Sequence, residues 1–141
     1  MQPTSLNSVR ITSVDPGTVL AALEAWARQI RRSRPEILAI GYFGSYANDR
    51  YGPGSDLDVL VVLSHSPLPR FFDRSPDLYP SSFPVGMDIF AYTTEEIDNL
   101  CADPGGWMRH VLKETVWIHP PPPGAGANAP LGGRSAEQPP G

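Results

Sequence analysis

Three aspartates lie on two short stretches of the chain that are otherwise largely apolar. Asp56 and Asp58 are two residues apart, and Asp88 lies inside the apolar run 85–90. Carboxylate oxygens are the hard ligands that Mg²⁺ and Mn²⁺ prefer, so three of them around one small volume suit a divalent cation. Carboxylates crowded on an apolar sheet repel one another and lose hydration, which favours a compensating cation or ready access to water.

A simpler interpretation of these aspartates stays open. Asp56 and Asp58 would also suit the exposed start of a strand, where water hydrates both carboxylates. For Asp88, a local hydrogen bond could stabilise the carboxylate in place of a metal ion.

The pair Gly44-Ser45 follows an apolar run and precedes residues that could begin a short helix. Backbone N–H groups and the Ser45 hydroxyl could hold a phosphate at such a position. A simple turn also favours Gly and Ser, so the pair by itself is consistent with either interpretation.

The elements that must position these residues follow from periodicity. Asp15-Pro16 predicts a helix N-terminus, and apolar residues at helical spacing continue to Ile30. Apolar runs predict strands over 37–43, 55–63 and 85–92, with a brief helix over 46–50. Alternate residues of a strand share a face, so Asp56 and Asp58 are expected to point the same way.

The second half of the chain is less regular. Residues 64–84 carry five prolines, which leave room only for a short helix around 70–74. Thr93 and Glu96 have the spacing of a capping box, which predicts a helix to about residue 100. Asp103-Pro104 predicts another helix, to about residue 113, and 116–118 predicts a short last strand.

Composition divides the chain into three parts. We expect a flexible N-terminus over 1–8, one folded domain over 9–119 and a disordered tail over 120–141, which holds 7 prolines and 5 glycines. The formal charge of −4 argues against direct nucleic-acid binding. Four arginines gather near the end of the first predicted helix, where a solvated helix end is favoured over a partner or nucleotide surface: Arg28, Arg31, Arg32 and Arg34.

Location is predicted from what the sequence lacks. The single cysteine, Cys101, cannot form an internal disulfide, and residues 1–10 do not have the pattern of a signal peptide. The apolar runs are far shorter than the roughly 20 residues that span a bilayer. We therefore expect a cytoplasmic protein with no membrane role.

The segment 44–59 resembles the signature of the DNA polymerase β-like nucleotidyltransferase superfamily. That signature reads G-S-x-A-R-G, five variable residues, then S-D-x-D and an apolar residue. This chain has GSYA at 44–47 and SDLDV at 55–59, at the same spacing. Asn48 and Asp49 replace the Arg-Gly pair, Arg50 is adjacent, and Asp88 falls where the third carboxylate of the family would lie.

This resemblance implies an α+β fold with a small, mixed, mainly antiparallel sheet and helices on one side. It also implies Mg²⁺, with Mn²⁺ as an alternative, and ATP as substrate. The implied catalytic residues and metal ligands are Asp56, Asp58 and Asp88. The implied nucleotide-binding residues are Gly44, Ser45, Arg50 and Ser55, and Tyr46 beside them would either stack on the base or pack in the core.

The compact length is similar to the minimal nucleotidyltransferases that pair with HEPN proteins in toxin–antitoxin modules. The implied activity is transfer of AMP from ATP to a hydroxyl of a protein partner, as antitoxin to a HEPN-type toxin. Only about 27 residues lie between Tyr92 and the proline-rich segment, so we expect the partner to supply the acceptor site. The alternatives are a small-molecule transferase, such as those that modify aminoglycosides, and a non-catalytic binding module, which the Asn48-Asp49 departure favours.

Overall fold

The computed structural model describes residues 14–119 and 134–135. The N-terminus predicted over 1–8 lies outside the described residues, as does the predicted tail except for Arg134–Ser135. Among the described residues, no helix has the length and apolar character needed to cross a bilayer.

Helix α1 (Pro16–Ser33) begins where the sequence predicts. The Asp15 carboxylate accepts a hydrogen bond from the Thr18 N–H at 3.1 Å, and Pro16 occupies the first turn. Its buried face consists of Val19, Leu23, Trp26 and Ala27. The Trp26 indole N–H donates to the carbonyl of Leu78 at 2.9 Å, which ties α1 to the long connection before the third strand.

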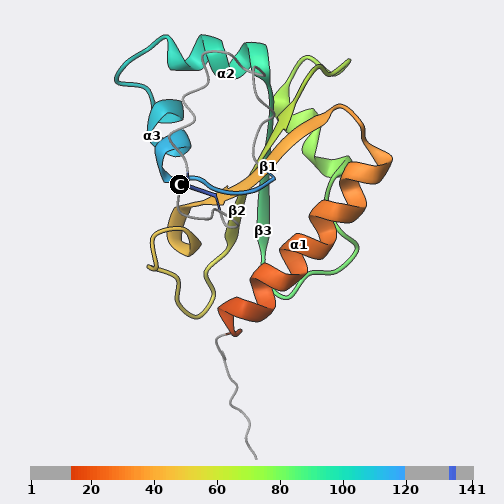
Figure 1. Ribbon diagram of the computed structural model, residues 1–141, viewed down its shortest axis with the longest axis vertical. Helices are drawn as coiled ribbons and strands as arrows, with labels where there is room; N and C mark the ends of the chain where they lie inside the picture. The colour runs from red at the N-terminus through yellow and green to blue at the C-terminus, as the bar shows by residue number, and fades with distance from the viewer. Residues whose placement is uncertain (1–13, 120–133, 136–141) are drawn as a thin grey trace, which may run out of the picture.

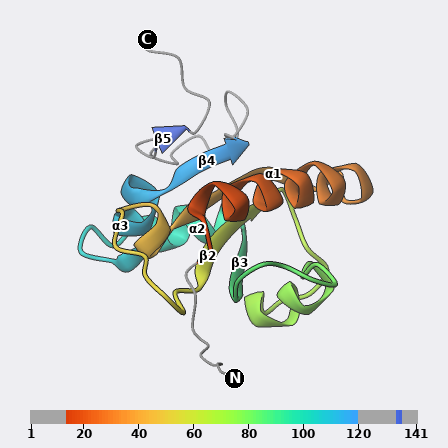
Figure 2. The same ribbon diagram turned by 90° about the horizontal axis from the view of Figure 1, so that it is seen from below.

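Within the described residues, five strands form one mixed sheet in the order β3-β2-β1-β4-β5. They are β1 (Ile37–Phe43), β2 (Leu57–Leu63), β3 (Met87–Thr93), β4 (Val116–His119) and β5 (Arg134–Ser135). β1 pairs antiparallel with β2 and β4, whereas β2–β3 and β4–β5 are parallel. Figure 2 shows β5 beside β4 at one edge. The predicted α+β class with a mixed sheet is confirmed.

Helices cover both faces of this sheet, so the expectation of helices on one side is wrong (Figure 1). One core cluster joins α1 to residues such as Val59 and Val61, and the second joins α2 (Thr94–Cys101) and α3 (Trp107–Glu114) to Leu60 and Val62. Successive β2 residues alternate between the clusters because side chains of a strand alternate between faces. Both faces are apolar, and each needs its own helical cover.

The capping box at the start of α2 is confirmed, because Thr93 Oγ1 accepts from the Glu96 N–H and the Glu96 carboxylate accepts from the Thr93 N–H. The predicted start of α3 at Asp103-Pro104 is wrong. The Asp103 carboxylate instead accepts from the Gly105 N–H at 3.1 Å in a turn, and α3 starts after Gly106. Two consecutive glycines are poor helix formers, which explains the later start.

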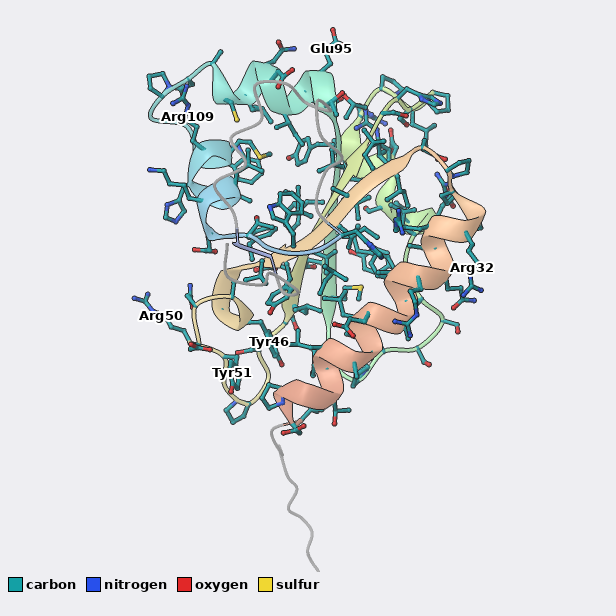
Figure 3. The ribbon with its side chains drawn as sticks, viewed as in Figure 1. Arg32, Tyr46, Arg50, Tyr51, Glu95 and Arg109 are labelled. Atoms are coloured by element: carbon teal, nitrogen blue, oxygen red, sulfur yellow. The ribbon has the colours of Figure 1, made fainter. Side chains whose placement is uncertain are left out.

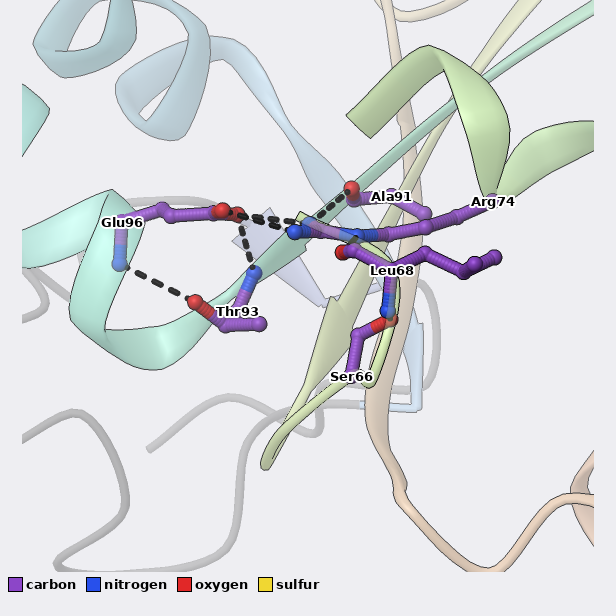
Figure 4. A network of polar contacts seen from close by, with 6 residues as sticks. All are labelled: Ser66, Leu68, Arg74, Ala91, Thr93 and Glu96. Atoms are coloured by element: carbon purple, nitrogen blue, oxygen red, sulfur yellow. Dashed lines mark hydrogen bonds and ion pairs between the residues drawn. The ribbon is translucent and has the colours of Figure 1, made fainter. Parts of the chain in front are cut away.

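The connection 64–84 is held by a network around Arg74, whose side chain is 4% exposed (Figure 4). The guanidinium donates to both carboxylate oxygens of Glu96, at 2.7 and 2.8 Å, and to the carbonyls of Leu68 and Ala91. Two short 3₁₀ turns, η3 (Phe71–Asp73) and η4 (Ser75–Asp77), flank it where a single short helix was predicted. The connection is thereby fixed to β3 and α2.

Strand β3 lies at the other edge of the sheet and carries Asp88. The Tyr79 hydroxyl, from the same long connection, accepts the Ile89 N–H at 3.0 Å. One donor of this edge strand is therefore occupied by a side chain.

Candidate active site

The turn after β1 is built around Gly44. Its φ of 78° lies in the left-handed region that favours glycine, and it begins the 3₁₀ turn η2 (Gly44–Tyr46), where a helix over 46–50 was predicted. The N–H groups of Ala47 and Asn48 donate to the Gly44 carbonyl at 2.9 and 3.1 Å, and the Arg50 N–H donates to the Ser45 carbonyl at 2.9 Å. Backbone bonds thus close the turn.

Asp58 lies directly against this turn. A Cβ built on Gly44 would collide with the Asp58 carboxylate, so the absence of a side chain at Gly44 lets the two approach. The strand register places Asp58 between Phe43 on β1 and Asp88 on β3. Since neighbours in register share a face of the sheet, Asp58 and Asp88 point to the same side.

Asp56 precedes β2 rather than beginning it, so the predicted strand start at residue 55 is two residues early. Its carboxylate packs against the backbone of Gly86, where a Cβ would collide with it. The Leu57 N–H donates to the Gly86 carbonyl at 2.8 Å. Asp56 and Asp88 are exposed, whereas Asp58 is half-buried.

Electrostatics link these carboxylates. The pKa of Asp58 is raised from 3.8 to about 6, first by burial and then by the negative charges of Asp88, Asp56 and Glu114. A carboxyl that loses hydration beside like charges is stabilised by protonation or by a nearby cation. The site is thus a concentration of negative charge beside a backbone turn.

Glu114, the last residue of α3, is a site residue that sequence reasoning missed. Its Oε2 accepts from the Gly44 N–H at 2.5 Å, and its Oε1 lies 3.6 Å from His110 Nε2. A carboxylate at a helix C-terminus is disfavoured by the helix dipole. That unfavourable placement is the one sequence signal that could have singled out Glu114.

The metal-ligand prediction stays a prediction. No group of three or more Asp, Glu, His or Cys side chains in residues 14–119 stands close enough together to hold an ion. The oxygen donors of Asp56, Asp58 and Asp88 have the chemistry that Mg²⁺ requires. In the described arrangement, however, Asp56 packs against Gly86 and Asp58 against Gly44.

The other residues that were expected to contact the nucleotide make different contacts from Gly44 and Asp58. Ser55 Oγ accepts a hydrogen bond from the Gly52 N–H at 2.8 Å, which stabilises the loop that contains both residues. Figure 3 shows the exposed Arg50 directed outward from the domain. Tyr46 is 8% exposed and stacks on Tyr51, with ring centroids 5.1 Å apart, so packing accounts for its ring.

Asp49 explains how the loop tolerates its departure from the family signature. Its φ is 62°, the left-handed conformation that the glycine of the signature would adopt without strain. Aspartate enters this region more readily than most residues. Asp49 is therefore compatible with a left-handed backbone at this position, whereas Asn48 places a neutral side chain where the signature has arginine.

Comparisons with known proteins concern the fold and the family of this chain. A crystal structure of a candidate nucleotidyltransferase from Sulfolobus solfataricus has a TM-score of 0.53 and 21% identity over 73% of this chain and 81% of that one. A toxin–antitoxin crystallised with AMP-PNP has a TM-score of 0.39 and 19% identity over 56% of this chain and 67% of that one. No curated protein matches the sequence.

The model of the nucleotidyltransferase domain family matches residues 25–99, which include Gly44, Asp58 and Asp88. Since that match spans more than half of the chain, this protein belongs to the nucleotidyltransferase domain family.

Proposed function

We propose that this nucleotidyltransferase transfers AMP from ATP to a hydroxyl group of a protein partner. The observation that carries the proposal is the position of Asp58, against Gly44 of the turn and in register with Asp88. A backbone turn suited to phosphate and a carboxylate suited to cations are therefore neighbours.

The roles follow from this placement. Gly44 and Ser45 would hold the β- and γ-phosphates. Asp56, Asp58 and Asp88 would hold divalent ions, which would neutralise the triphosphate and activate the attacking oxygen. Asp88 would also accept the proton of the acceptor hydroxyl. The acceptor oxygen would form a bond to the α-phosphorus, the bond from that phosphorus to the α–β bridging oxygen would break, and pyrophosphate would leave.

The exposure of Asp56 and Asp88 supports a protein acceptor, because a hydroxyl on the surface of another folded protein could reach them. We extend the proposal to a HEPN-type toxin, with this chain as its antitoxin, on the resemblance of the chain to the minimal nucleotidyltransferases that pair with HEPN proteins. A small hydroxyl compound of the aminoglycoside kind is the alternative acceptor.

A second candidate is a module that binds its partner without turnover. The observation in its favour is that Glu114 occupies the Gly44 N–H, which a bound phosphate would need. In that case the carboxylates would contribute to the contact surface only.

Labelled transfer separates these candidates. The protein is incubated with ATP labelled at the α-phosphate, Mg²⁺ and the product of its neighbouring gene, in parallel with an aminoglycoside. We expect label on the protein acceptor with matching release of pyrophosphate, and Asp58→Asn should reduce both to background. Glu24→Gln, which removes an exposed charge on α1, is the matched control and should transfer normally.

The outcomes are distinct. Label on the aminoglycoside alone would identify the small-molecule alternative. A stable complex with the neighbouring protein, without label or pyrophosphate, would support the binding module and reject the enzyme. Normal transfer by Asp58→Asn would show that the site is assigned wrongly.

A further inference from the structure

The backbone donor at the start of the phosphate turn is already occupied. Glu114 Oε2 accepts the Gly44 N–H at 2.5 Å, although the two residues are 70 positions apart in the sequence. The contact joins the C-terminal end of α3 to the loop between β1 and β2. Gly44 lies within the stretch 25–99 on which family membership rests, whereas Glu114 lies outside it.

The turn does not depend on this contact for its shape. Its conformation is set by the positive φ of Gly44 and by the N–H groups of Ala47, Asn48 and Arg50, which donate to turn carbonyls. Helix α3 is likewise anchored elsewhere, through the buried residues Met108, Val111 and Leu112. Removing the Glu114 carboxylate should therefore leave both elements in place.

The carboxylate resembles a phosphate in the features that matter at this donor. Both are anions that take charge-assisted hydrogen bonds from backbone N–H groups. One N–H cannot serve both, and the carboxylate of Asp58 already lies against the same glycine. A phosphate that arrived with Glu114 in place would meet an occupied donor and two negative charges.

We propose that Glu114 is an internal competitor of the nucleotide, which occupies the Gly44 N–H and must leave before a phosphate oxygen binds there. The inference rests on the proposed function, because it takes the turn as the phosphate site. The Glu114 side chain can turn away from Gly44 toward solvent, since it is 21% exposed. His110 lies one helical turn back, is 78% exposed, and offers a second partner 3.6 Å from Oε1.

Anion affinity without turnover tests this competition. Binding of AMP-PNP and of inorganic tripolyphosphate is measured by calorimetry in EDTA, for the wild type, Glu114→Gln, Glu114→Ala and the control Glu24→Gln. We expect both Glu114 variants to bind each anion at least about tenfold more tightly than the wild type, since a charged hydrogen bond no longer has to be displaced. Glu24→Gln should match the wild type.

Equal or weaker anion binding by the Glu114 variants would overturn the inference. Weaker Mn²⁺ binding by Glu114→Gln in a spin-resonance titration, with no gain in anion affinity, would make Glu114 a metal ligand instead. If Glu114→Ala fails to fold, the anion affinity of the near-isosteric Glu114→Gln decides the question. If the Glu114 variants bind anions more tightly but the wild type transfers no AMP, the competition stands and the proposed function is rejected. If the wild type transfers AMP but the Glu114 variants bind anions with unchanged affinity, only the competition is rejected.

Discussion

Asp58 is half-buried beside three other carboxylates, and this placement makes stability depend on pH. Because its pKa rises from 3.8 unfolded to about 6 folded, its favourable contribution is complete below pH 3.8 and is lost as the pH rises through 6. Asp58→Asn should therefore be more stable than the wild type at pH 8, by about 1 kcal/mol after allowance for solvent screening, and nearly equal to it at pH 3.5.

Urea unfolding in EDTA at the two pH values measures this difference. Glu24→Gln serves as the control, because it removes a charge that is exposed on α1. A wild type as stable as Asp58→Asn at pH 8 would contradict the prediction.

Asp49 gives a prediction that concerns the backbone alone. Its φ of 62° should make Asp49→Val cost about 1–2 kcal/mol, because a β-branched residue is strained in the left-handed region. Asp49→Gly should stay within about 0.5 kcal/mol of the wild type, since glycine has no such strain. Denaturant midpoints measure both, with Asn48→Val as the neighbouring control. Equal stability of the two valine variants would count against strain at Asp49.

At this scale the sequence predicts residue types better than contacts. The spacing of Gly44, Asp56 and Asp58 predicts that these residues lie near one another, and in the structure Asp58 lies against Gly44. Glu114 escapes prediction because 70 positions separate it from Gly44, and only folding brings them together. A glycine within an apolar run is a sequence signal that another group approaches the backbone closely, and Gly86 in the run 85–90 does lie against the Asp56 carboxylate.

Among the elements, β1 and β4 approach each other closely at Gly41. A Cβ there would lie 2.5 Å from Thr115 Cγ2 and 2.9 Å from the carbonyl oxygen of Val116. Backbone atoms cannot rotate away, so Gly41→Ala should destabilise the domain by about 1–3 kcal/mol and displace β4. Gly52→Ala is the matched control, since its Cβ would meet nothing within 4 Å. Thermal unfolding of both variants checks the prediction, and an unchanged melting temperature for Gly41→Ala would refute the close packing.

Local signals predict the elements because their causes are local. The Asp15 cap and the Thr93–Glu96 capping box each lie within four residues, and both helices begin where expected. The face on which each helix packs depends on how the chain crosses the sheet, which no local pattern records. The sequence pattern therefore predicts the strands, whereas the resemblance implied helices on one face and the structure has them on both.

Over the whole molecule, the pair formed by Arg74 and Glu96 ties the long connection to the sheet and to α2. The hydrogen bonds from Arg74 lower the pKa of Glu96 below its ordinary 4.5, so the stability that Glu96 confers is present above pH 4.5 and is lost as the pH falls further. Glu96→Gln should cost about 1–2 kcal/mol at pH 7 and flatten the fall in stability below pH 4.5.

Unfolding free energies between pH 3 and 7 test this role, with Glu95→Gln as control, because Glu95 is the exposed neighbour in the same first turn of α2. A parallel pH dependence in Glu96→Gln and the wild type would show that the pair does not govern acid stability.

The hydrogen bond that the Tyr79 hydroxyl accepts from β3 has a consequence for how this protein contacts other molecules. Exposed edge strands invite a strand from another chain to add to the sheet, which leads to aggregation. Here the N–H of Ile89, next to Asp88, already has a side-chain acceptor. A strand arriving from a neighbouring copy would have to displace the Tyr79 hydroxyl from that N–H, which adds a cost to strand pairing at the edge of the sheet that carries Asp88.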